Sequence, residues 1–377
     1  MKRIIGNIWI SFLLLKNFLQ HKKELIPENL KSILIIELSR MGDVVSMIYA
    51  VLCLMKNFPT STFSFVVDER YQNLLEKLLF YNSVDLSRVK IYGFSSTDTL
   101  KGLRLTKKKL DKVHYDLICS MSPSFRNGFL ALSLNSTFKI GFFRSNSIYT
   151  PFLEKNRVEA VGIRNFASKS FLSENIEERG LKICSSLGLN SANSQKKVNL
   201  TKVNPPVNFN EPYIIIHPFA GWKYRSWNYL NYAQLIKNIL ARIDVNIFVI
   251  GSLEEKLIGE KLCNLVESPN VYPIFEEKLD TILNLIPHAE LFIGNDSGPL
   301  HLASIFDVPV IGIYGPAPPD LTAPRKKGNY YFYKKLECSP CKQIRCIRPE
   351  DTCTEQVTVD EVTQKVFEYL KNLKINE

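Results

Sequence analysis

The sequence predicts an α/β protein made of two successive parallel-sheet domains, and three observations indicate this fold class. Short continuous apolar runs such as "SILIIE" alternate with helical segments along most of the chain. Such runs are typical of strands that are buried on both faces. The chain has 377 residues, which is long for one core. Residues 201–212 hold three prolines and interrupt the alternation, so we expect the interdomain linker there.

The overall composition fits a folded, basic protein. Hydrophobic residues make up 45% and charged residues 23% of the chain, which is typical of globular domains rather than of disordered segments. The formal net charge is +11. This excess favours partners that carry phosphates or form an anionic membrane surface. The zinc-finger, RNA-recognition and helix-turn-helix signatures do not occur, so we expect no nucleic-acid partner.

Residues 1–30 predict a helix on the membrane surface. The apolar segment from Ile4 to Leu19 is interrupted by polar residues and flanked by basic ones. It is too short and too broken for a transmembrane helix, and no signal-peptide cleavage site follows it. We expect an amphipathic helix at the inner membrane, and therefore a cytoplasmic protein that is peripherally associated with it. A helix packed on the domain fits the pattern equally well.

Residues 31–200 form the first predicted domain. Its strands are expected at residues 32–37, 62–67, 88–92, 115–120 and 138–142. Helical spacing of apolar residues occurs at residues 43–58, 71–80 and 126–134. Because strands and helices alternate, the sheet should be parallel.

The turn after the first strand is rich in polar residues. It contains Ser39, Arg40, Gly42 and Asp43. At the start of a helix, Asp43 fits a capping carboxylate that the helix dipole stabilises. It also fits a general base that takes the proton of an attacking hydroxyl group. We expect it to be a lone carboxylate without a partner at glycosidase spacing, which favours direct displacement over two-acid hydrolysis.

Residues 213–356 form the second predicted domain, and residues 357–377 a C-terminal helix. Strands are expected at residues 213–217, 245–251, 271–275, 290–294 and 308–315. Helices are expected at residues 229–243, 253–266, 279–287 and 299–306. The last helix begins with a capping-box spacing from Thr358 to Glu361 and continues as an amphipathic pattern.

A turn of the second domain predicts a site for a phosphorylated sugar. Asp296, Ser297 and Gly298 follow the strand at residues 290–294, and His301 lies about one helical turn later. In open α/β sheets, ligands bind beyond the carboxyl ends of the strands, where helix N-termini offer free N–H groups. The same residue types also fit a plain helix cap.

A second turn of this domain carries cations. Gly221, Lys223 and Arg225 follow the strand at residues 213–217. Positive charge at this place can neutralise a diphosphate leaving group. Surface Lys and Arg residues that are only solvated are the ordinary alternative.

Four stretches together resemble glycosyltransferase family 9, the lipopolysaccharide heptosyltransferases and their relatives. They are "SRMGDVV", "HPFAGWKYRSWNYLNYAQL", "VIGSLEEK" and "GNDSGPLHLASIFDVPVIGIYGPAPPDLTAP". The resemblance runs from about Lys31 to Leu373. It implies a GT-B fold, in which two Rossmann-like domains face an interdomain cleft. It also implies metal-independent, inverting transfer from a nucleotide-diphosphate sugar, typically ADP-heptose.

The resemblance also implies roles for individual residues. Asp43 matches the general base. Arg225 stands where the family usually carries Lys, and Asn228 replaces a common Pro, so the donor is less firmly implied than the fold. The residues expected on the acceptor side of the cleft are Ser39, Arg40 and Gly42. Those expected to bind the donor are Gly221, Lys223, Arg225, Asp296, Ser297, Gly298 and His301.

The eight cysteines fall into two groups. Four lie far apart in apolar or helical stretches and are expected to be buried thiols: Cys53, Cys119, Cys184 and Cys263. The other four form a C-x2-C-x4-C-x6-C array: Cys338, Cys341, Cys346 and Cys353. This array could hold a structural zinc ion or a small cluster. Free thiols or disulfides are the alternatives, and we expect no catalytic metal.

The expected function is therefore that of an inverting glycosyltransferase. It would move a sugar, expected to be heptose from ADP-heptose, onto the lipopolysaccharide core or a related lipid-linked saccharide. One alternative is a nucleotide-sugar epimerase or hydrolase of the same fold, which would convert the donor without an acceptor. The other is a non-catalytic protein that binds nucleotide sugars.

Overall fold

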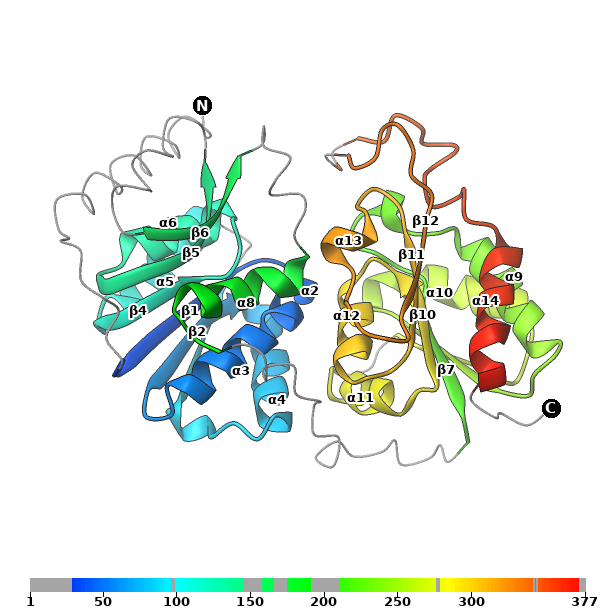
Figure 1. Ribbon diagram of the computed structural model, residues 1–377. Coiled ribbons are helices and arrows are strands. Elements are labelled where there is room, and N and C mark those ends of the chain that lie inside the picture. Colours follow the sequence, from blue (N-terminus) through cyan, green and yellow to red (C-terminus); the bar gives the residue numbers. More distant parts are fainter. Residues whose placement is uncertain are drawn as a thin grey trace. The chain divides into compact units, whose positions relative to one another are not determined.

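The computed structural model describes residues 29–95, 99–145, 158–165, 175–190, 211–275, 279–341, 343 and 345–372. The chain divides into two compact units, Met1–Lys196 and Lys197–Glu377 (Figure 1). The expected membrane-surface helix lies almost entirely outside the described residues, as does most of the expected linker. Within the described ranges, no helix is both long and apolar enough to cross a membrane.

The first unit contains a six-stranded parallel sheet. The strand order is β3-β2-β1-β4-β5-β6. The strands are β1 Ser32–Glu37, β2 Thr62–Asp68, β3 Val89–Phe94, β4 Tyr115–Ser120, β5 Ser136–Ser145 and β6 Val158–Asn165. The five expected strands are confirmed. The edge strand β6 is an additional one, which the sequence hides because polar residues and a glycine interrupt its apolar pattern.

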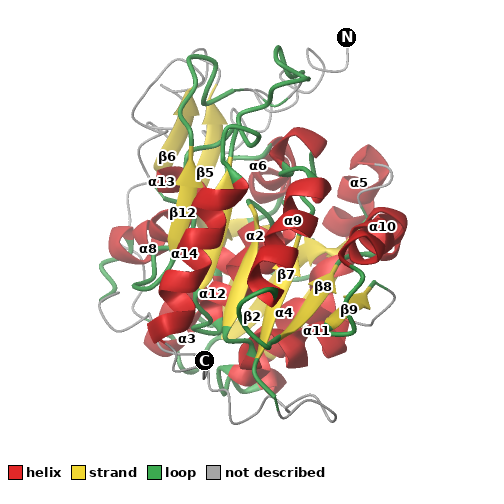
Figure 2. Cartoon of the chain, turned by 90° about the vertical axis from the view of Figure 1, so that its right-hand side faces the viewer, coloured by secondary structure: helices red, strands yellow, loops and turns green. Residues whose placement is uncertain are grey.

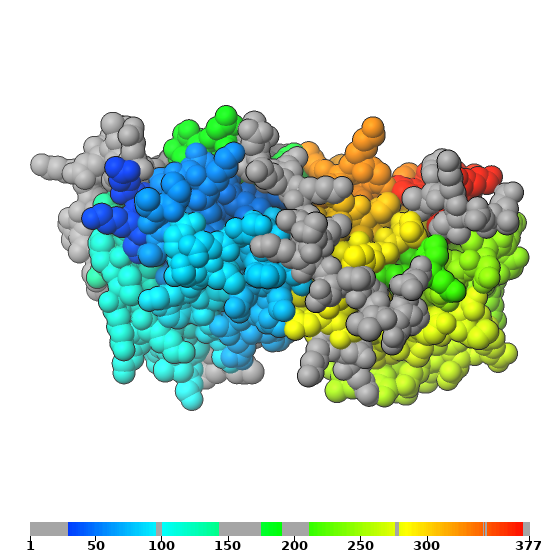
Figure 3. All heavy atoms as spheres, turned by 90° about the horizontal axis from the view of Figure 1, so that it is seen from below, coloured from blue at the N-terminus to red at the C-terminus, as the bar shows by residue number. Residues whose placement is uncertain are grey.

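Helices cover both faces of this sheet. They are α2 Met41–Ser46, α3 Ile48–Asn57, α4 Gln72–Tyr81, α5 Thr99–Leu110, α6 Phe125–Ser133 and α8 Ile176–Ser186, with short 3-10 turns η1 Glu69–Tyr71 and η2 Leu86–Arg88. Apolar side chains of α5 and α6 form one core with Leu34 and Ile36 of β1. Figure 3 shows the side chains of this unit, with the cyan segments below the blue ones in that view. The single helix expected at residues 43–58 is in fact two, α2 and α3, which meet at Met47.

The second unit repeats the topology of the first. Its sheet has the order β12-β11-β10-β7-β8-β9, and the strands pair in parallel. The strands are β7 Tyr213–His217, β8 Asn246–Ile250, β9 Val271–Ile274, β10 Leu291–Asn295, β11 Val310–Tyr314 and β12 Tyr330–Tyr333. Counted from its first strand, each unit has the order 3-2-1-4-5-6, which is that of a Rossmann fold. The expected two-domain parallel α/β fold is confirmed.

The helices of the second unit also form two layers. They are α9 Tyr229–Leu240, α10 Lys256–Val266, α11 Leu279–Leu285, α12 Gly298–Ile305, α13 Pro319–Thr322 and α14 Val359–Asn372, with 3-10 turns η5 Lys223–Arg225, η6 Leu253–Glu255 and η7 Ile286–His288. Helices α9, α10 and α14 share one core with the sheet, on the side that faces the viewer in Figure 2. The expected C-terminal helix is α14, which packs on α9 inside this unit.

The dispersed cysteines mostly lie where the sequence predicts. Cys53, Cys119 and Cys184 are buried, and burial raises the pKa of the Cys119 thiol to about 12. Cys263, on α10, is only half-buried. The expectation of a buried thiol at Cys263 is therefore wrong, because the amphipathic helix turns this position toward the edge of its packed face.

Candidate active site

Each unit has a topological switch point, where the first and fourth strands of its sheet lie side by side. These pairs are β1 with β4 and β7 with β10. The chain leaves the two strands of each pair in opposite directions, which opens a crevice at their carboxyl ends, where ligands of this fold class bind. All of the expected site residues come directly after β1, β7 or β10, so the topology brings them to these two points.

Asp43 occupies the third position of α2, directly after the β1 turn. The N–H group of Arg40, the residue before the helix, donates a hydrogen bond to Asp43 Oδ2 at 3.2 Å. The carboxylate also lines a small hollow in the first unit. The two interpretations of Asp43 are therefore compatible, since it caps the helix and still faces a pocket.

Glu37, the last residue of β1, shares this hollow with Asp43. Its side chain is buried, and its Oε1 atom accepts hydrogen bonds from Ser39 N at 2.9 Å and from Ser122 Oγ at 3.1 Å. Burial, followed by the charge of Asp43, raises the pKa of Glu37 to about 8. The expectation that Asp43 is a lone carboxylate is therefore wrong. The sequence hides Glu37 because it ends an apolar strand whose other residues only form core.

A buried amide ties the ends of β1 and β4 together. Asn127 of α6 accepts a hydrogen bond from Leu38 N at 3.0 Å and donates to Ile36 O at 3.0 Å and to Ser122 Oγ at 3.1 Å. Ser122 Oγ also lies 2.9 Å from Ser39 Oγ. This network fixes the turn that carries Ser39, and with it the hydroxyl group beside Glu37.

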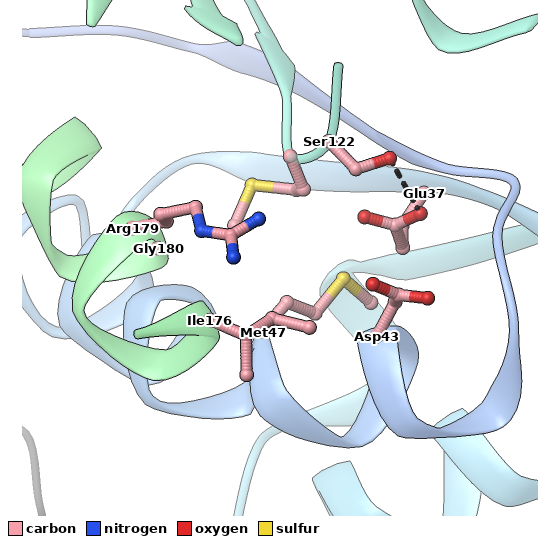
Figure 4. A pocket seen from close by; sticks show the side chains of 8 residues that line it. Glu37, Asp43, Met47, Ser122, Ile176, Arg179 and Gly180 are labelled. Atoms are coloured by element: carbon pink, nitrogen blue, oxygen red, sulfur yellow. Dashed lines mark hydrogen bonds between the residues drawn. The ribbon is translucent and has the colours of Figure 1, made fainter. Parts of the chain in front are cut away.

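The opposite wall of the hollow comes from α8. In Figure 4 the guanidinium group of Arg179 extends into the hollow from that helix, while Glu37 and Asp43 approach from the other side. Met47 and Met121 supply apolar walls. The pocket therefore combines two acids, a hydroxyl group and a cation. Sequence reasoning did not find Arg179, because α8 is distant along the chain and carries no motif.

In the second unit, Arg225 and Asp296 form an ion pair across the switch point. Arg225 Nη1 lies 3.2 Å from Asp296 Oδ2, and the two side chains are only 20% and 6% exposed. Arg225 Nε also donates to Gln343 Oε1 at 2.6 Å. Lys223, in contrast, is exposed and lies over the Tyr224 ring, with Nζ 4.7 Å from the ring centroid. The structure thus brings Arg225 to the Asp296 loop, and Gly221 lies exposed in the same turn.

Ser297 and His217 form the second polar pair of this switch point. Ser297 Oγ lies 3.1 Å from Nδ1 of His217, the last residue of β7. Burial lowers the pKa of His217 to about 4, so its imidazole is neutral at physiological pH. Ser297 precedes α12, but its side chain makes no hydrogen bond that caps this helix. The N–H groups of Gly298, Leu300 and His301, in the first turn of α12, are therefore not capped by this side chain, and a helix N-terminus of this kind suits an anion.

Buried side chains hold the Asp296 loop in place through hydrogen bonds. Asn295 Oδ1 accepts a hydrogen bond from Trp227 N at 2.9 Å, and Trp227 Nε1 donates to Val357 O at 2.9 Å. His301 is buried one turn into α12. His217 and Asn295 were missed as site residues because each ends an apolar strand, as Glu37 does.

The cysteine array packs beside the same loops. Cys341 N donates to Pro316 O at 3.1 Å, and Thr354 Oγ1 donates to Ser226 O at 3.2 Å. Burial, and then the charges of the three other thiols of the array, raise the pKa of Cys353 to about 11. In the part of the chain that the structure describes, no three His, Cys, Asp or Glu side chains form a group that could hold a metal ion.

Known proteins are similar to this chain in sequence and in fold. The chain is 23% identical to the lipopolysaccharide core heptosyltransferase OpsX of Haemophilus influenzae over 307 residues, which are 80% of this chain and 83% of that protein. A family 9 glycosyltransferase from Veillonella parvula superposes with a TM-score of 0.68 at 17% identity and covers 92% of this chain and 98% of its own. The E. coli heptosyltransferase WaaC with ADP-2-deoxy-2-fluoro heptose gives a TM-score of 0.64 at 18% identity, with 89% and 99% covered.

The sequence model of the family described as glycosyltransferase family 9 (heptosyltransferase) matches residues 103–350. This range includes the fourth strand of the first unit and both strands of the second switch point. Because the match covers well over half of the sequence, the chain belongs to glycosyltransferase family 9.

Proposed function

We propose that this glycosyltransferase is an inverting enzyme that moves heptose from ADP-heptose onto the lipopolysaccharide core or a related lipid-linked saccharide. The observation that carries the proposal is the contrast between its switch points. One is lined by two acids and Arg179, and the other holds the Arg225–Asp296 ion pair beside a helix N-terminus. The names of two similar proteins support the substrates, since OpsX is a lipopolysaccharide core heptosyltransferase and WaaC was solved with an ADP-heptose analogue.

The acceptor is proposed to bind at the first switch point. Asp43 would take the proton of the acceptor hydroxyl group while that oxygen forms a bond to the anomeric carbon of the donor. Ser39, Arg40 and Gly42 would line the acceptor side, because they make up the turn before Asp43. Glu37 would keep Ser122 and the turn in place through its two hydrogen bonds.

The donor is proposed to bind at the second switch point. The N–H groups at the start of α12 and the Ser297 hydroxyl group suit phosphate oxygens, and Asp296 suits sugar hydroxyl groups. As the anomeric C–O bond breaks, its electron pair leaves on the diphosphate. Arg225, with Lys223 nearby in the same turn, would balance this charge. These groups supply the electrostatic stabilisation that a metal ion gives in other transferases, which supports metal-independent transfer.

The site of action is proposed to be the cytoplasmic face of the inner membrane. A lipid-linked acceptor would be presented there, and the net charge of +11 favours an anionic surface. The N-terminal residues 1–30, with their basic and apolar pattern, would contribute an amphipathic helix.

The structural metal at Cys338, Cys341, Cys346 and Cys353 stays a prediction. The influence of three thiols on the pKa of Cys353 supports their nearness, but the described side chains do not form a metal-binding group. Elemental analysis for zinc and iron on the purified protein tests it, with the double variant C338S/C341S as control. A metal-free wild-type protein would rule the metal out.

Calorimetry and a transfer assay test the proposed function together. We expect ADP to bind more tightly than UDP, GDP or CDP, and ADP release from ADP-heptose to require an acceptor. A preference for UDP or GDP would remove heptose from the proposal. Donor conversion without acceptor would indicate the epimerase or hydrolase alternative, and binding without turnover on any acceptor would indicate a non-catalytic protein.

A further inference from the structure

Helix α5 of the first unit presents an unusual combination of side chains to solvent. Its sequence from Thr99 to Leu110 contains five basic residues and no acidic one. Leu100 and Leu105 are large apolar residues that are 54% and 52% exposed. With ~3.6 residues per turn, one outward half of the helix carries both leucines and most of the cations. We call this surface the α5 basic face; it consists of Leu100, Lys101, Arg104, Leu105, Lys108 and Lys109.

The inward half of α5 explains why this face points outward. Leu103 and Leu110 are buried in one core with Phe94 of β3. A Cβ atom at Gly102 would lie 2.4 Å from the carbonyl oxygen of Ser95, so the helix packs closely on the end of β3. The helix therefore has little freedom to rotate, and its leucines cannot turn into the core.

A second helix of the chain shows that exposed leucines alone are not the signal. Leu253 and Leu257, around the start of α10, are each 66% exposed. They are interleaved with three acidic side chains, Glu254, Glu255 and Glu260, and with two basic ones, Lys256 and Lys261, so this segment has no excess of positive charge. Acidic groups would be repelled by an anionic surface, whereas the cations of the α5 basic face would be attracted by it.

The position of α5 in the first unit suits a lipid-linked acceptor. Every helix that follows a strand of this parallel sheet starts at the carboxyl-end edge, where the Asp43 pocket lies. Strand β3 is separated from β1 by β2 alone, which places the strands roughly 10 Å apart at a spacing of about 4.8 Å per strand. The start of α5 and the proposed general base are thus on the same edge.

We propose that the α5 basic face is a docking surface for the anionic lipid headgroups of a membrane. The inference rests on the proposed function in one respect, because a lipid-linked acceptor gives the surface its purpose. Apolar side chains among cations fit the boundary between headgroups and acyl chains. A single-stranded nucleic acid would instead call for aromatic side chains on which bases stack, and the α5 basic face has none.

Vesicle co-sedimentation of the full chain tests the proposal. The probes are vesicles of phosphatidylcholine alone and of phosphatidylcholine mixed with phosphatidylglycerol. We expect binding only to the mixed vesicles. The triple variant R104E/K108E/K109E should bind them on the order of a hundredfold more weakly, given the contribution of each basic residue near such a surface. The variant L100S/L105S should bind about tenfold more weakly, because it removes the inserted apolar surface.

Two matched variants of the second unit serve as controls. K237E/K261E/K335E changes the net charge by the same amount at exposed lysines. L253S/L257S removes leucines that are more exposed than those of α5. Both should bind the mixed vesicles like the wild type. Equal loss in the α5 and control charge variants, or full binding by R104E/K108E/K109E, would overturn the proposal. Tighter retention of the wild type on single-stranded RNA than on the mixed vesicles, lost in the same variant, would also overturn it.

A transfer assay separates this proposal from the proposed function. With acceptor dispersed in detergent, the α5 variants should turn over at the wild-type rate. With acceptor in vesicles that contain phosphatidylglycerol, the transfer rate of each α5 variant should fall by the same factor as its affinity for the mixed vesicles. If the wild type transfers no heptose in either format, the proposed function fails, while the co-sedimentation result still decides the docking surface.

Discussion

The two switch points of this chain have the same topology but carry different polar side chains. In the first unit, the carboxyl ends of β1 and β4 hold Glu37 and Asp43 in a hollow. In the second, the ends of β7 and β10 hold a neutral imidazole and an Arg–Asp ion pair in front of α12. The strand order fixes where a ligand can bind, and the loops determine which ligand binds. Acids suit removal of a proton from a neutral acceptor, and cations suit an anionic donor.

The largest effect on activity is expected when the acid of the first switch point is replaced. Asp43→Asn should lower kcat by about 10²- to 10⁴-fold, because the amide cannot take the acceptor proton. It should leave the Kd for the donor nearly unchanged, because the donor is proposed to bind the second unit. The amide oxygen can still accept from Arg40 N, so the cap of α2 and the Tm should be retained. Transfer at the wild-type rate would rule out Asp43 as the base.

The next largest effect, on stability and on donor affinity, is expected when the cation of the second switch point is removed. Arg225→Ala leaves the carboxylate of Asp296 buried without its cation, which should lower the free energy of unfolding by about 3 kcal/mol. Donor affinity should fall with it. Urea unfolding and calorimetry measure the two effects. Lys223→Ala, at an exposed position, should change stability by less than about 0.5 kcal/mol. Equal effects at both positions would contradict the importance of the ion pair, and the double variant R225A/D296N should recover part of the loss.

The pH dependence of the free energy of unfolding tests the role of Glu37 in the first switch point. Its pKa in the folded chain is raised from 4.5 to about 8, so the folded state holds its proton more tightly than the unfolded state. This contribution to stability is complete below pH 4.5 and is lost as the pH rises toward 8, with a slope of at most about 1.4 kcal/mol per pH unit. Glu37→Gln should remove that slope from urea unfolding curves. An unchanged slope in the variant would show that other groups cause it.

His217 should have the smallest effect, and its contribution to stability should depend on pH in the opposite direction to that of Glu37. Its pKa is lowered from 6.5 to about 4, so the unfolded state binds the proton more tightly. The resulting stability is present above pH 6.5 and is lost as the pH falls toward 4. His217→Gln should remove the loss of stability at acid pH and leave the loss toward pH 8, which Glu37 causes, unchanged. If the variant changes both losses, the two switch points do not contribute to stability independently.

The sequence predicts most of the fold because parallel strands that are buried on both faces appear as short apolar runs. The edge strand β6 lacks such a run, and the break at Met47 has no signal, so both were missed. Asp43, Arg225 and Asp296 stand out as polar residues in turns. Glu37, Asn127 and His217 do not, because they sit in or beside apolar elements. Their contacts join segments that only the folded chain brings together, and Arg179 is the clearest case.

Asn127 has a consequence for the natural and designed variation of this chain. Its carboxamide serves one backbone N–H group and one backbone carbonyl group of the same turn, at Leu38 and Ile36. Leucine would offer neither a donor nor an acceptor and would leave the Leu38 N–H group without its acceptor, at a cost of about 1–3 kcal/mol. Aspartate would offer no donor and would lose the bonds to Ile36 O and Ser122 Oγ, although Ile36 O still accepts from Met121 N at 3.1 Å. In a saturation library read out by acceptor turnover, this position should accept almost nothing else. A redesign that aims at new acceptors should therefore start from the residues that line the hollow, such as Met47 and Ile176, and leave this amide in place.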